Sequence, residues 1–269
     1  MTVRAKNIKA YGGWIKDAEP ILNRNYRCLE NHAAPLEKDR IDYFEDYRTR
    51  YFYDRFFPGQ GAEEILDTLS EFSGTPKSWI DIGSGVTSLF WGLAINTSLL
   101  TEISTCDLVP EALFVLKNFI YDDEIPPCYT DALKLLNKPV LQVNTLRNLN
   151  WSFHIFDCLK PWPEIMLNTR HDLVTAIGCL GLSKTEDDYR TAFAAVANQI
   201  AEGGKIVGAD WIRSSSFIKD EGHDNSYISA ELIEFCGRKY GLQKLRVQTV
   251  PILDDDYYDS VTVWAFNKV

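Results

Sequence analysis

From about residue 56 onwards, short apolar stretches alternate with longer stretches in which apolar residues recur at helical spacing. A short apolar or alternating run is typical of a strand, and a period near 3.6 is typical of an amphipathic helix. Strands are therefore predicted at 78–83, 102–107, 151–157, 171–178, 205–210, 244–250 and 260–268. Helices are predicted at 62–72, 86–96, 110–122, 183–204 and 229–240, and a helix with a loop within 130–150.

Cap residues define the ends of two of these helices. Pro110 stands where its fixed φ suits the first turn of a helix. Ser183 and Glu186 have the spacing of a capping box, which predicts a helix start at this point. Gly203 and Gly204 are expected to end the same helix, because glycine commonly follows the last helical turn.

The alternation of strands and helices predicts an α/β fold. We expect a Rossmann-like, doubly wound, mostly parallel seven-stranded sheet with helices on both faces and a C-terminal antiparallel hairpin. The first 55 residues differ, since they are rich in aromatic and charged residues with weak helical periodicity. The chain is thus predicted to consist of an N-terminal helical segment, 1–55, and an α/β domain, 56–269.

Charge and cysteine usage narrow the classes of protein. The net charge of −10 argues against nucleic-acid binding, which relies on lysine and arginine to neutralise phosphates. No apolar run approaches the roughly 20 residues that span a bilayer, and the first residues lack the apolar core of a signal peptide. The six cysteines form no C-x-x-C pair, so we expect a cytoplasmic protein without disulfides or a bound metal.

The stretch WIDIGSGVTS, residues 79–88, indicates a buried strand that turns sharply into a helix over a ligand. Ligands in doubly wound sheets bind beyond the carboxyl ends of the strands, where the strand order reverses. Four aspartates lie in or at the ends of predicted strands: Asp81, Asp107, Asp157 and Asp210. So many acids near one edge of a sheet favour a binding site.

The charge of this turn distinguishes between possible cofactors. A dinucleotide fingerprint needs a third glycine, and Ser88 stands in its place. Asp81 would disfavour an anionic pyrophosphate, whereas S-adenosylmethionine has no phosphate and carries an ammonium group and a sulfonium. Asp107 could accept both ribose hydroxyls, and Asp157 could accept from the adenine amine, with the N–H of Cys158 reaching a ring nitrogen.

The chain resembles the class I methyltransferases, and more narrowly the nicotinamide, phenylethanolamine and thioether N-methyltransferases. The resemblance runs from about residue 44 to the end and rests on four stretches: IDIGSGVT, FEDYRTRYFYDRFF, FDCLKPWP and EGGKIVGADWIRSSSF. The second stretch is similar to a tyrosine-bearing lid over the cofactor, so the resemblance implies a helical lid within 1–55. The first 40 residues show no counterpart in this family.

The resemblance implies roles for individual residues. It implies cofactor contacts for Tyr47, Tyr51, Gly83, Ser84, Gly85, Thr87, Asp107, Leu108, Asp157, Cys158 and Ile177. It implies acceptor contacts for Asp210, Trp211, Ser214 and Tyr47. The glutamates that hold the amine in phenylethanolamine enzymes are replaced by Gly181 and Arg213, and Phe52 replaces a paired tyrosine. Phenylethanolamine is therefore not the expected acceptor, and nicotinamide is not indicated either.

The resulting hypothesis is methyl transfer from S-adenosylmethionine to a small-molecule acceptor at nitrogen, by in-line displacement under a closed lid, leaving S-adenosylhomocysteine. A protonated amine or a hydroxyl acceptor would need a base, for which Asp210 and His223 are the candidates. The acidic run 254–259 is interpreted as a hairpin loop, or alternatively as an acceptor entrance that favours an amine. The sequence does not indicate the oligomeric state.

Other functions remain open at this point. The same fold serves O- and C-methyltransferases that act on small molecules. A catalytically silent protein that only binds the cofactor is a second possibility. An NAD-linked oxidoreductase is a third, disfavoured by Ser88 and Asp81.

Overall fold

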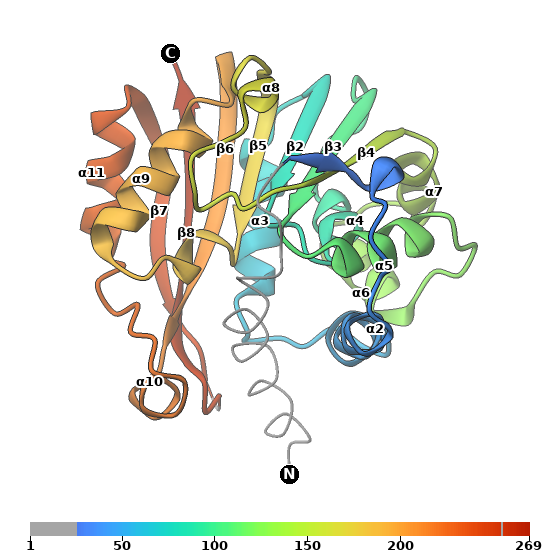
Figure 1. The fold of residues 1–269 in the computed structure, drawn as a ribbon, viewed down its shortest axis with the longest axis horizontal. Coiled ribbons are helices and arrows are strands. Elements are labelled where there is room, and N and C mark those ends of the chain that lie inside the picture. The colour runs from blue at the N-terminus through green and yellow to red at the C-terminus, as the bar shows by residue number, and fades with distance from the viewer. Residues whose placement is uncertain (1–25, 254) are drawn as a thin grey trace.

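A mixed eight-stranded sheet forms the centre of the molecule (Figure 1). The computed structural model describes residues 26–253 and 255–269. The strand order is β1-β4-β3-β2-β5-β6-β8-β7. The strands are β1 (Arg27–Cys28), β2 (Ser78–Ile82), β3 (Glu102–Asp107), β4 (Asn150–Ile155), β5 (His171–Ile177), β6 (Ile200–Arg213), β7 (Leu242–Pro251) and β8 (Tyr258–Lys268).

The pairing confirms the predicted doubly wound sheet. Strands β4, β3, β2, β5 and β6 are parallel, and β8 is antiparallel to both β6 and β7. The predicted C-terminal hairpin is therefore present. The chain passes from β2 outward to β3 and β4 and then returns to β5 on the other side, so the strand order reverses between β2 and β5. The unpredicted eighth strand, β1, is only two residues long and pairs with β4.

Helices cover both faces of the sheet because its side chains alternate between them. Trp79 and Leu173 belong to one apolar cluster, and Ile80 and Val174 belong to the other. The first cluster includes α3 (Ala62–Phe72), α4 (Ser88–Gly92), α5 (Pro110–Ile120), α6 (Pro127–Leu135) and α7 (Leu141–Arg147). The second includes α8 (Glu164–Leu167), α9 (Glu186–Ala197) and α11 (Ala230–Lys239).

Helix α2 (Lys38–Phe52) is the described helix of the predicted segment 1–55. Its Phe44 is buried in a small apolar cluster with Val109, Ala112 and Val115, next to and within α5. Residues 1–25 of that segment lie outside the described residues. The expected 1–55 boundary therefore stays a prediction, although the structure shows where α2 packs.

Several predicted boundaries are wrong for local reasons. The cap of α9 is Thr185, whose side chain accepts the N–H of Asp188, and not Ser183 with Glu186. This helix ends at Ala197, because the chain from Ile200 onwards already pairs with β5. The helix predicted over 86–96 is reduced to the five residues of α4, and 130–150 holds parts of two helices, α6 and α7.

The described residues also include the 3-10 turns η2 (Leu29–Asn31) and η3 (Leu180–Leu182) and the short helix α10 (Ser215–Glu221). All six cysteines are free thiols in the structure. No helix in the described part of the chain is both long enough and apolar enough to cross a membrane.

Candidate functional site

The turn between β2 and α4 requires two glycines. Gly83 and Gly85 have φ values of +64° and +51°, which L-residues with side chains rarely adopt. A Cβ atom on Gly83 would lie 2.4 Å from the Cβ of Cys179, so this glycine allows close packing against the segment after β5. Within the described part of the chain no atom would lie within 4 Å of a Cβ atom on Gly85, so this glycine faces space that those residues leave open.

Asp81 lies beneath this turn. Its side chain is 1% exposed and accepts hydrogen bonds from the hydroxyls of Ser88 at 2.6 Å and Thr175 at 2.5 Å. Burial raises the pKa of Asp81 to about 6, while the two hydroxyl donors oppose the shift. Through these two hydrogen bonds, the buried carboxylate of Asp81 connects β2 with Ser88 of α4 and Thr175 of β5.

Asp107 ends β3 directly beside the glycine turn. One carboxylate oxygen accepts the N–H of Gly85 at 2.9 Å, and the other accepts the N–H of Val109 at 2.9 Å. Burial raises the pKa of Asp107, the charge of Asp157 adds to that rise, and the backbone donors oppose it. The structure therefore brings together the turn and two of the predicted acids.

Asp157 lies two residues beyond the end of β4 and accepts the N–H of Leu159 at 3.0 Å. The side chain of Cys158 is buried, and its Sγ lies 3.2 Å from the Sγ of Cys179. Cys179 in turn lies against Gly83. The segments that follow β2, β4 and β5 thus meet at one place on the carboxyl edge of the sheet.

The remaining residues predicted to contact the cofactor surround this place. Thr87 donates to the carbonyl of Ser84 at 3.1 Å and accepts the indole N–H of Trp91 at 2.9 Å, so its hydroxyl is directed into the protein. Ser84 and Ile177 are buried. Leu108 packs on the cluster that holds α2.

Helix α2 presents a row of tyrosines. Tyr43, Tyr47 and Tyr51 are spaced by four residues and therefore share one face of the helix. The rings of Tyr47 and Tyr51 lie 4.9 Å apart. Tyr47 is 36% exposed, and the loss of part of its hydration raises its pKa, with the nearby phenols of Tyr43, Tyr51 and Tyr258 adding to the rise. Tyr258, at the start of β8, therefore lies close to this row.

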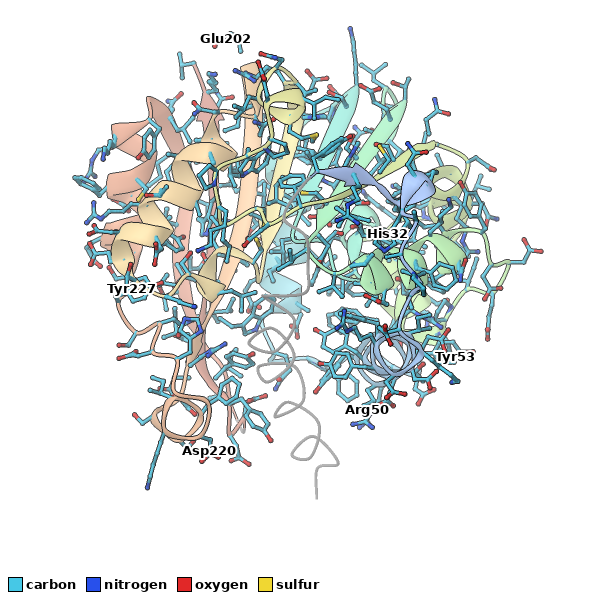
Figure 2. All side chains as sticks on the ribbon, viewed as in Figure 1. His32, Arg50, Tyr53, Glu202, Asp220 and Tyr227 are labelled. Carbon is cyan, nitrogen blue, oxygen red and sulfur yellow. The ribbon has the colours of Figure 1, made fainter. Side chains whose placement is uncertain are left out.

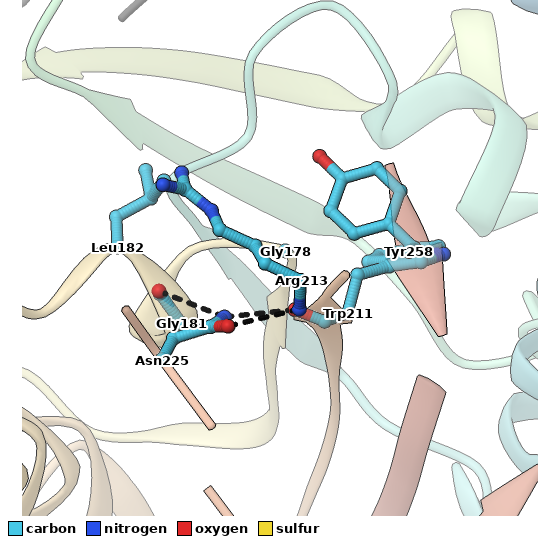
Figure 3. A pocket seen from close by; sticks show the side chains of 7 residues that line it. All are labelled: Gly178, Gly181, Leu182, Trp211, Arg213, Asn225 and Tyr258. Atoms are coloured by element: carbon cyan, nitrogen blue, oxygen red, sulfur yellow. Dashed lines mark hydrogen bonds between the residues drawn. The ribbon is translucent and has the colours of Figure 1, made fainter. Parts of the chain in front are cut away.

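A small pocket lies beside this region, at the carboxyl ends of β5 and β6 (Figure 3). Its cavity volume is about 50 Å³, and it is lined by Gly178, Gly181, Leu182, Trp211, Arg213, Asn225 and Tyr258. Asn225 donates to the carbonyl of Trp211 at 2.9 Å and accepts the N–H of Arg213 at 2.9 Å. Trp211 donates to the carbonyl of Gln60 at 3.1 Å. These contacts fix two walls of the pocket.

The other predicted acceptor residues lie outside this lining. Asp210 is 0% exposed, and its carboxylate accepts hydrogen bonds from Gly181 N–H at 2.7 Å, Tyr189 O–H at 2.9 Å and Trp264 Nε1–H at 3.1 Å. Burial raises its pKa to about 6. The structure thus places Asp210 behind the pocket, where it holds the backbone of Gly181.

Ser214 and His223 also contact the protein itself. Ser214 caps α10 by accepting the N–H of Phe217, and its hydroxyl donates to the carbonyl of Asp256 at 2.7 Å. The Nε2–H of His223 donates to the carbonyl of Ser183 at 2.8 Å. These bonds hold both side chains in place.

Figure 2 places the carboxyl edge between two outer elements. Arg50 of α2 and Asp220 of α10 lie on opposite sides of this edge, and Glu202, near the start of β6, lies at the opposite edge of the sheet. The glycine turn, the tyrosine row and the pocket therefore all belong to the edge where a doubly wound sheet binds ligands.

No family model and no curated protein matches the sequence. Solved structures do match. Magnesium protoporphyrin IX methyltransferase from Synechocystis PCC 6803, with bound S-adenosylhomocysteine, has a TM-score of 0.51 at 10% identity, over 98% of this chain and 100% of that one. An O-methyltransferase family protein from Burkholderia thailandensis has a TM-score of 0.53 at 15% identity, over 99% and 74%.

Phosphoethanolamine N-methyltransferase 2 from Haemonchus contortus, in complex with S-adenosylmethionine, has a TM-score of 0.54 at 15% identity, over 85% of this chain and 57% of that one. This chain has the class I methyltransferase fold. At such low identity the likeness establishes the fold alone. The narrower resemblance to the nicotinamide and phenylethanolamine enzymes remains a prediction.

Within this methyltransferase fold, sequence reasoning missed several residues of the edge. Tyr43 could have been found, because it continues the four-residue spacing of Tyr47 and Tyr51. Tyr258 was assigned to an acidic loop, yet it begins β8 and lines the pocket. Asn225 gives no signal in the sequence, since its role depends on two segments that meet only in the folded chain.

Proposed function

We propose that this protein is an S-adenosylmethionine-dependent methyltransferase that acts on a small molecule at nitrogen. The observation that carries the proposal is the pair of Gly85 and Asp107. Gly85 faces open space, and its N–H is held by a carboxylate at the end of the neighbouring strand, at the point where the strand order reverses.

The residues at the edge suit this cofactor. The backbone can be approached closely at Gly85, where a side chain would occupy the space. Asp107 retains acceptor capacity for ribose hydroxyls, since each carboxylate oxygen can accept more than one hydrogen bond. Asp157 lies near enough to shift the pKa of Asp107, and two carboxylates at one place disfavour a cofactor with a pyrophosphate.

S-adenosylmethionine supplies the methyl group as an electrophile when it is bound. The protein must then align a lone pair of the acceptor and exclude water. We assign the exclusion of water to the tyrosine row of α2, with Tyr258 opposite, because these phenols lie close to one another beside the pocket. Such a closing element would also commit the bound molecules to reaction.

The state of Asp210 supports a nitrogen acceptor. The carboxylate of Asp210 is enclosed by three donors, and the Nε2–H of His223 is bonded to a carbonyl. A hydroxyl acceptor needs a base within hydrogen-bond reach, whereas a neutral nitrogen already carries its lone pair. Asp210 therefore serves better as a support of the pocket than as a proton acceptor.

The decisive experiment is calorimetric titration of S-adenosylhomocysteine into the protein. NADH is titrated in parallel, because the competing hypothesis is an NAD-linked oxidoreductase. We expect the wild type to bind S-adenosylhomocysteine and Asp107→Ala to bind it about 10- to 100-fold more weakly, since hydrogen bonds to charged groups contribute about 1.5–3 kcal/mol. Asp172→Ala is the matched control. Asp172 also accepts two backbone N–H groups, those of Lys77 and Ser78, but at the opposite edge of the sheet.

Absence of S-adenosylhomocysteine binding by the folded wild type, or tight binding of NADH, would refute the proposal. Turnover with matched amines, alcohols and thiols, read by mass spectrometry of the methylated product, then identifies the acceptor atom. Cofactor binding without any product would favour the catalytically silent alternative.

A further inference from the structure

Two buried thiols contact each other at the carboxyl edge of the sheet. The Sγ atoms of Cys158 and Cys179 lie 3.2 Å apart, and the two residues are 6% and 3% exposed. In a disulfide bond the two sulfur atoms are separated by about 2.05 Å. The two thiols therefore need to approach each other by only about 1.2 Å to form this bond.

Both cysteines lie in connecting segments next to the glycine turn. Cys158 lies in the segment after β4, and Cys179 lies in the segment after β5. A Cβ atom on Gly83 would lie 2.6 Å from the Sγ of Cys179, so this thiol packs directly against the turn. A bond between the two sulfur atoms would therefore move backbone segments that border the proposed cofactor site.

A third buried thiol lies in the same apolar cluster. Cys106, on β3, is 0% exposed and belongs to the cluster that contains Cys158 and Cys179. Its thiol donates to the carbonyl of Asp81 at 3.6 Å. Cys106 is thus bonded to the backbone of β2, whereas the other two thiols are bonded to each other.

The pocket offers a small oxidant an approach to this pair. Gly178 and Gly181 flank Cys179 in the chain, and both line the pocket (Figure 3). Its volume of about 50 Å³ exceeds the roughly 10–15 Å³ that one water molecule needs. Hydrogen peroxide is little larger than water and fits this volume, whereas a peptide disulfide does not.

The surroundings of the two thiols differ and indicate which one reacts first. The hydrogen bond with Cys158 and then burial raise the pKa of Cys179 well above its ordinary value, so that Cys179 stays protonated. Cys158 is the more exposed of the two. Because the reactive form of cysteine is the thiolate, Cys158 is the first nucleophile and Cys179 the resolving thiol.

We propose that Cys158 and Cys179 form an oxidation site for small peroxides, and that their reversible disulfide weakens cofactor binding; the effect on the cofactor rests on the proposed function. The sulfur of Cys158 attacks one peroxide oxygen, the O–O bond breaks, and the other oxygen leaves as water with the thiol proton. The sulfur of Cys179 then attacks the sulfenic acid, the S–S bond forms, the S–O bond breaks, and the hydroxyl leaves as water with the proton of Cys179. The two sulfur atoms give up two electrons, which the peroxide accepts.

The test treats the reduced protein with hydrogen peroxide, alkylates the remaining thiols and identifies linked peptides by mass spectrometry. We expect a peptide pair that joins Cys158 to Cys179. Calorimetry on the same sample should show binding of S-adenosylhomocysteine that is at least about tenfold weaker and is restored by dithiothreitol. By linkage, saturating S-adenosylhomocysteine should lower the ratio of disulfide to dithiol by the same factor in mixtures of oxidised and reduced dithiothreitol.

Variants separate this pair from general oxidation of the protein. Cys179→Ala should yield no linked peptide, and peroxide should cause no loss of affinity that dithiothreitol reverses. Cys158→Ala should behave in the same way. Cys106→Ala is the matched control, because Cys106 is a buried thiol of the same cluster that is bonded to a carbonyl instead. It should retain both the linked peptide and the reversible loss.

The outcomes are distinct from those of the cofactor experiment. Absence of the linked peptide in the oxidised wild type, a link from either cysteine to Cys106, or a reversible loss that persists in folded Cys179→Ala would each overturn the proposal. A linked peptide with unchanged affinity would overturn the effect on the cofactor. Peptide mapping needs no cofactor, so a wild type that forms the disulfide but binds no S-adenosylhomocysteine when reduced would retain the oxidation site and refute the methyltransferase function.

Discussion

Three buried donors converge on the carboxylate of Asp210: the N–H of Gly181, the phenol of Tyr189 and the indole of Trp264. They come from the segment after β5, from α9 and from β8. A single residue thus connects both sides of β6 behind the pocket. The sequence predicted that Asp210 lies at a strand end beside the acceptor, but it could not show which side of the pocket wall the carboxylate occupies.

Removal of this carboxylate should reduce stability strongly. Asp210→Ala leaves three buried donors without an acceptor, so the free energy of unfolding should fall by about 3 kcal/mol or more. Tyr189→Phe removes one donor and leaves two in place, so it should cost about 1 kcal/mol. Urea denaturation measures both. A loss below about 1 kcal/mol in Asp210→Ala would contradict the structural role.

At the scale of elements, the β2–α4 turn contains two glycines with the same backbone requirement and different surroundings. Gly83 lies against Cys179, and Gly85 faces open space. The tyrosine row of α2 is a similar case. Its four-residue spacing can be seen in the sequence of one helix, whereas the neighbouring Tyr258 belongs to β8, which is distant in the chain. In both cases the sequence predicts the element, and packing determines what each residue contacts.

The two glycines should therefore respond differently to the same substitution. Gly85→Ala should cost about 1–2 kcal/mol of backbone strain, remain folded, and lose S-adenosylhomocysteine binding, because its methyl group would occupy the open space. Gly83→Ala adds a clash with Cys179 and should cost roughly 3 kcal/mol. Thermal unfolding and calorimetry distinguish the two effects. Normal binding by Gly85→Ala would contradict its place in the cofactor site.

At the scale of the whole molecule, buried histidine and aspartate side chains change the free energy of unfolding in opposite directions as the pH falls. His171, at the start of β5, is 7% exposed, and burial lowers its pKa to about 4. The unfolded chain takes up this proton below about pH 6.5, so the contribution of His171 to stability falls as the pH falls from 6.5 to 4. Asp81 and Asp210, with pKa values raised to about 6, favour the folded state as the pH falls through 6.

Substitutions can separate these opposing contributions. Relative to the wild type, His171→Phe should gain about 2 kcal/mol in free energy of unfolding between pH 7 and pH 5, because it removes the proton uptake of the unfolded state. Asp81→Asn should lose about 1 kcal/mol over the same interval, since it removes the opposite effect. Urea denaturation at both pH values measures the differences. Parallel shifts in the two variants would contradict the assignment.

The sequence by itself determined the elements and their order. Hydrophobic periodicity is a local property, and it predicted the seven main strands, the parallel core and the C-terminal hairpin that the structure shows. The two glycines likewise indicated the β2–α4 turn from the sequence, because a backbone with positive φ strongly favours glycine. The four aspartates could also be placed from the sequence, because Asp81 and Asp210 lie within strands, Asp107 ends β3 and Asp157 follows β4 by two residues.

Only the tertiary structure decided which of these residues face one another. Asp81 and Asp107 have the same side chain and both belong to strands, yet one lies under the turn and the other beside it. The pocket combines Gly181, Arg213, Asn225 and Tyr258 from four separate segments. Burial and contact depend on the packing of distant segments. A charge pattern along the chain therefore cannot reveal that Arg213 lines the pocket while Asp210 lies behind it.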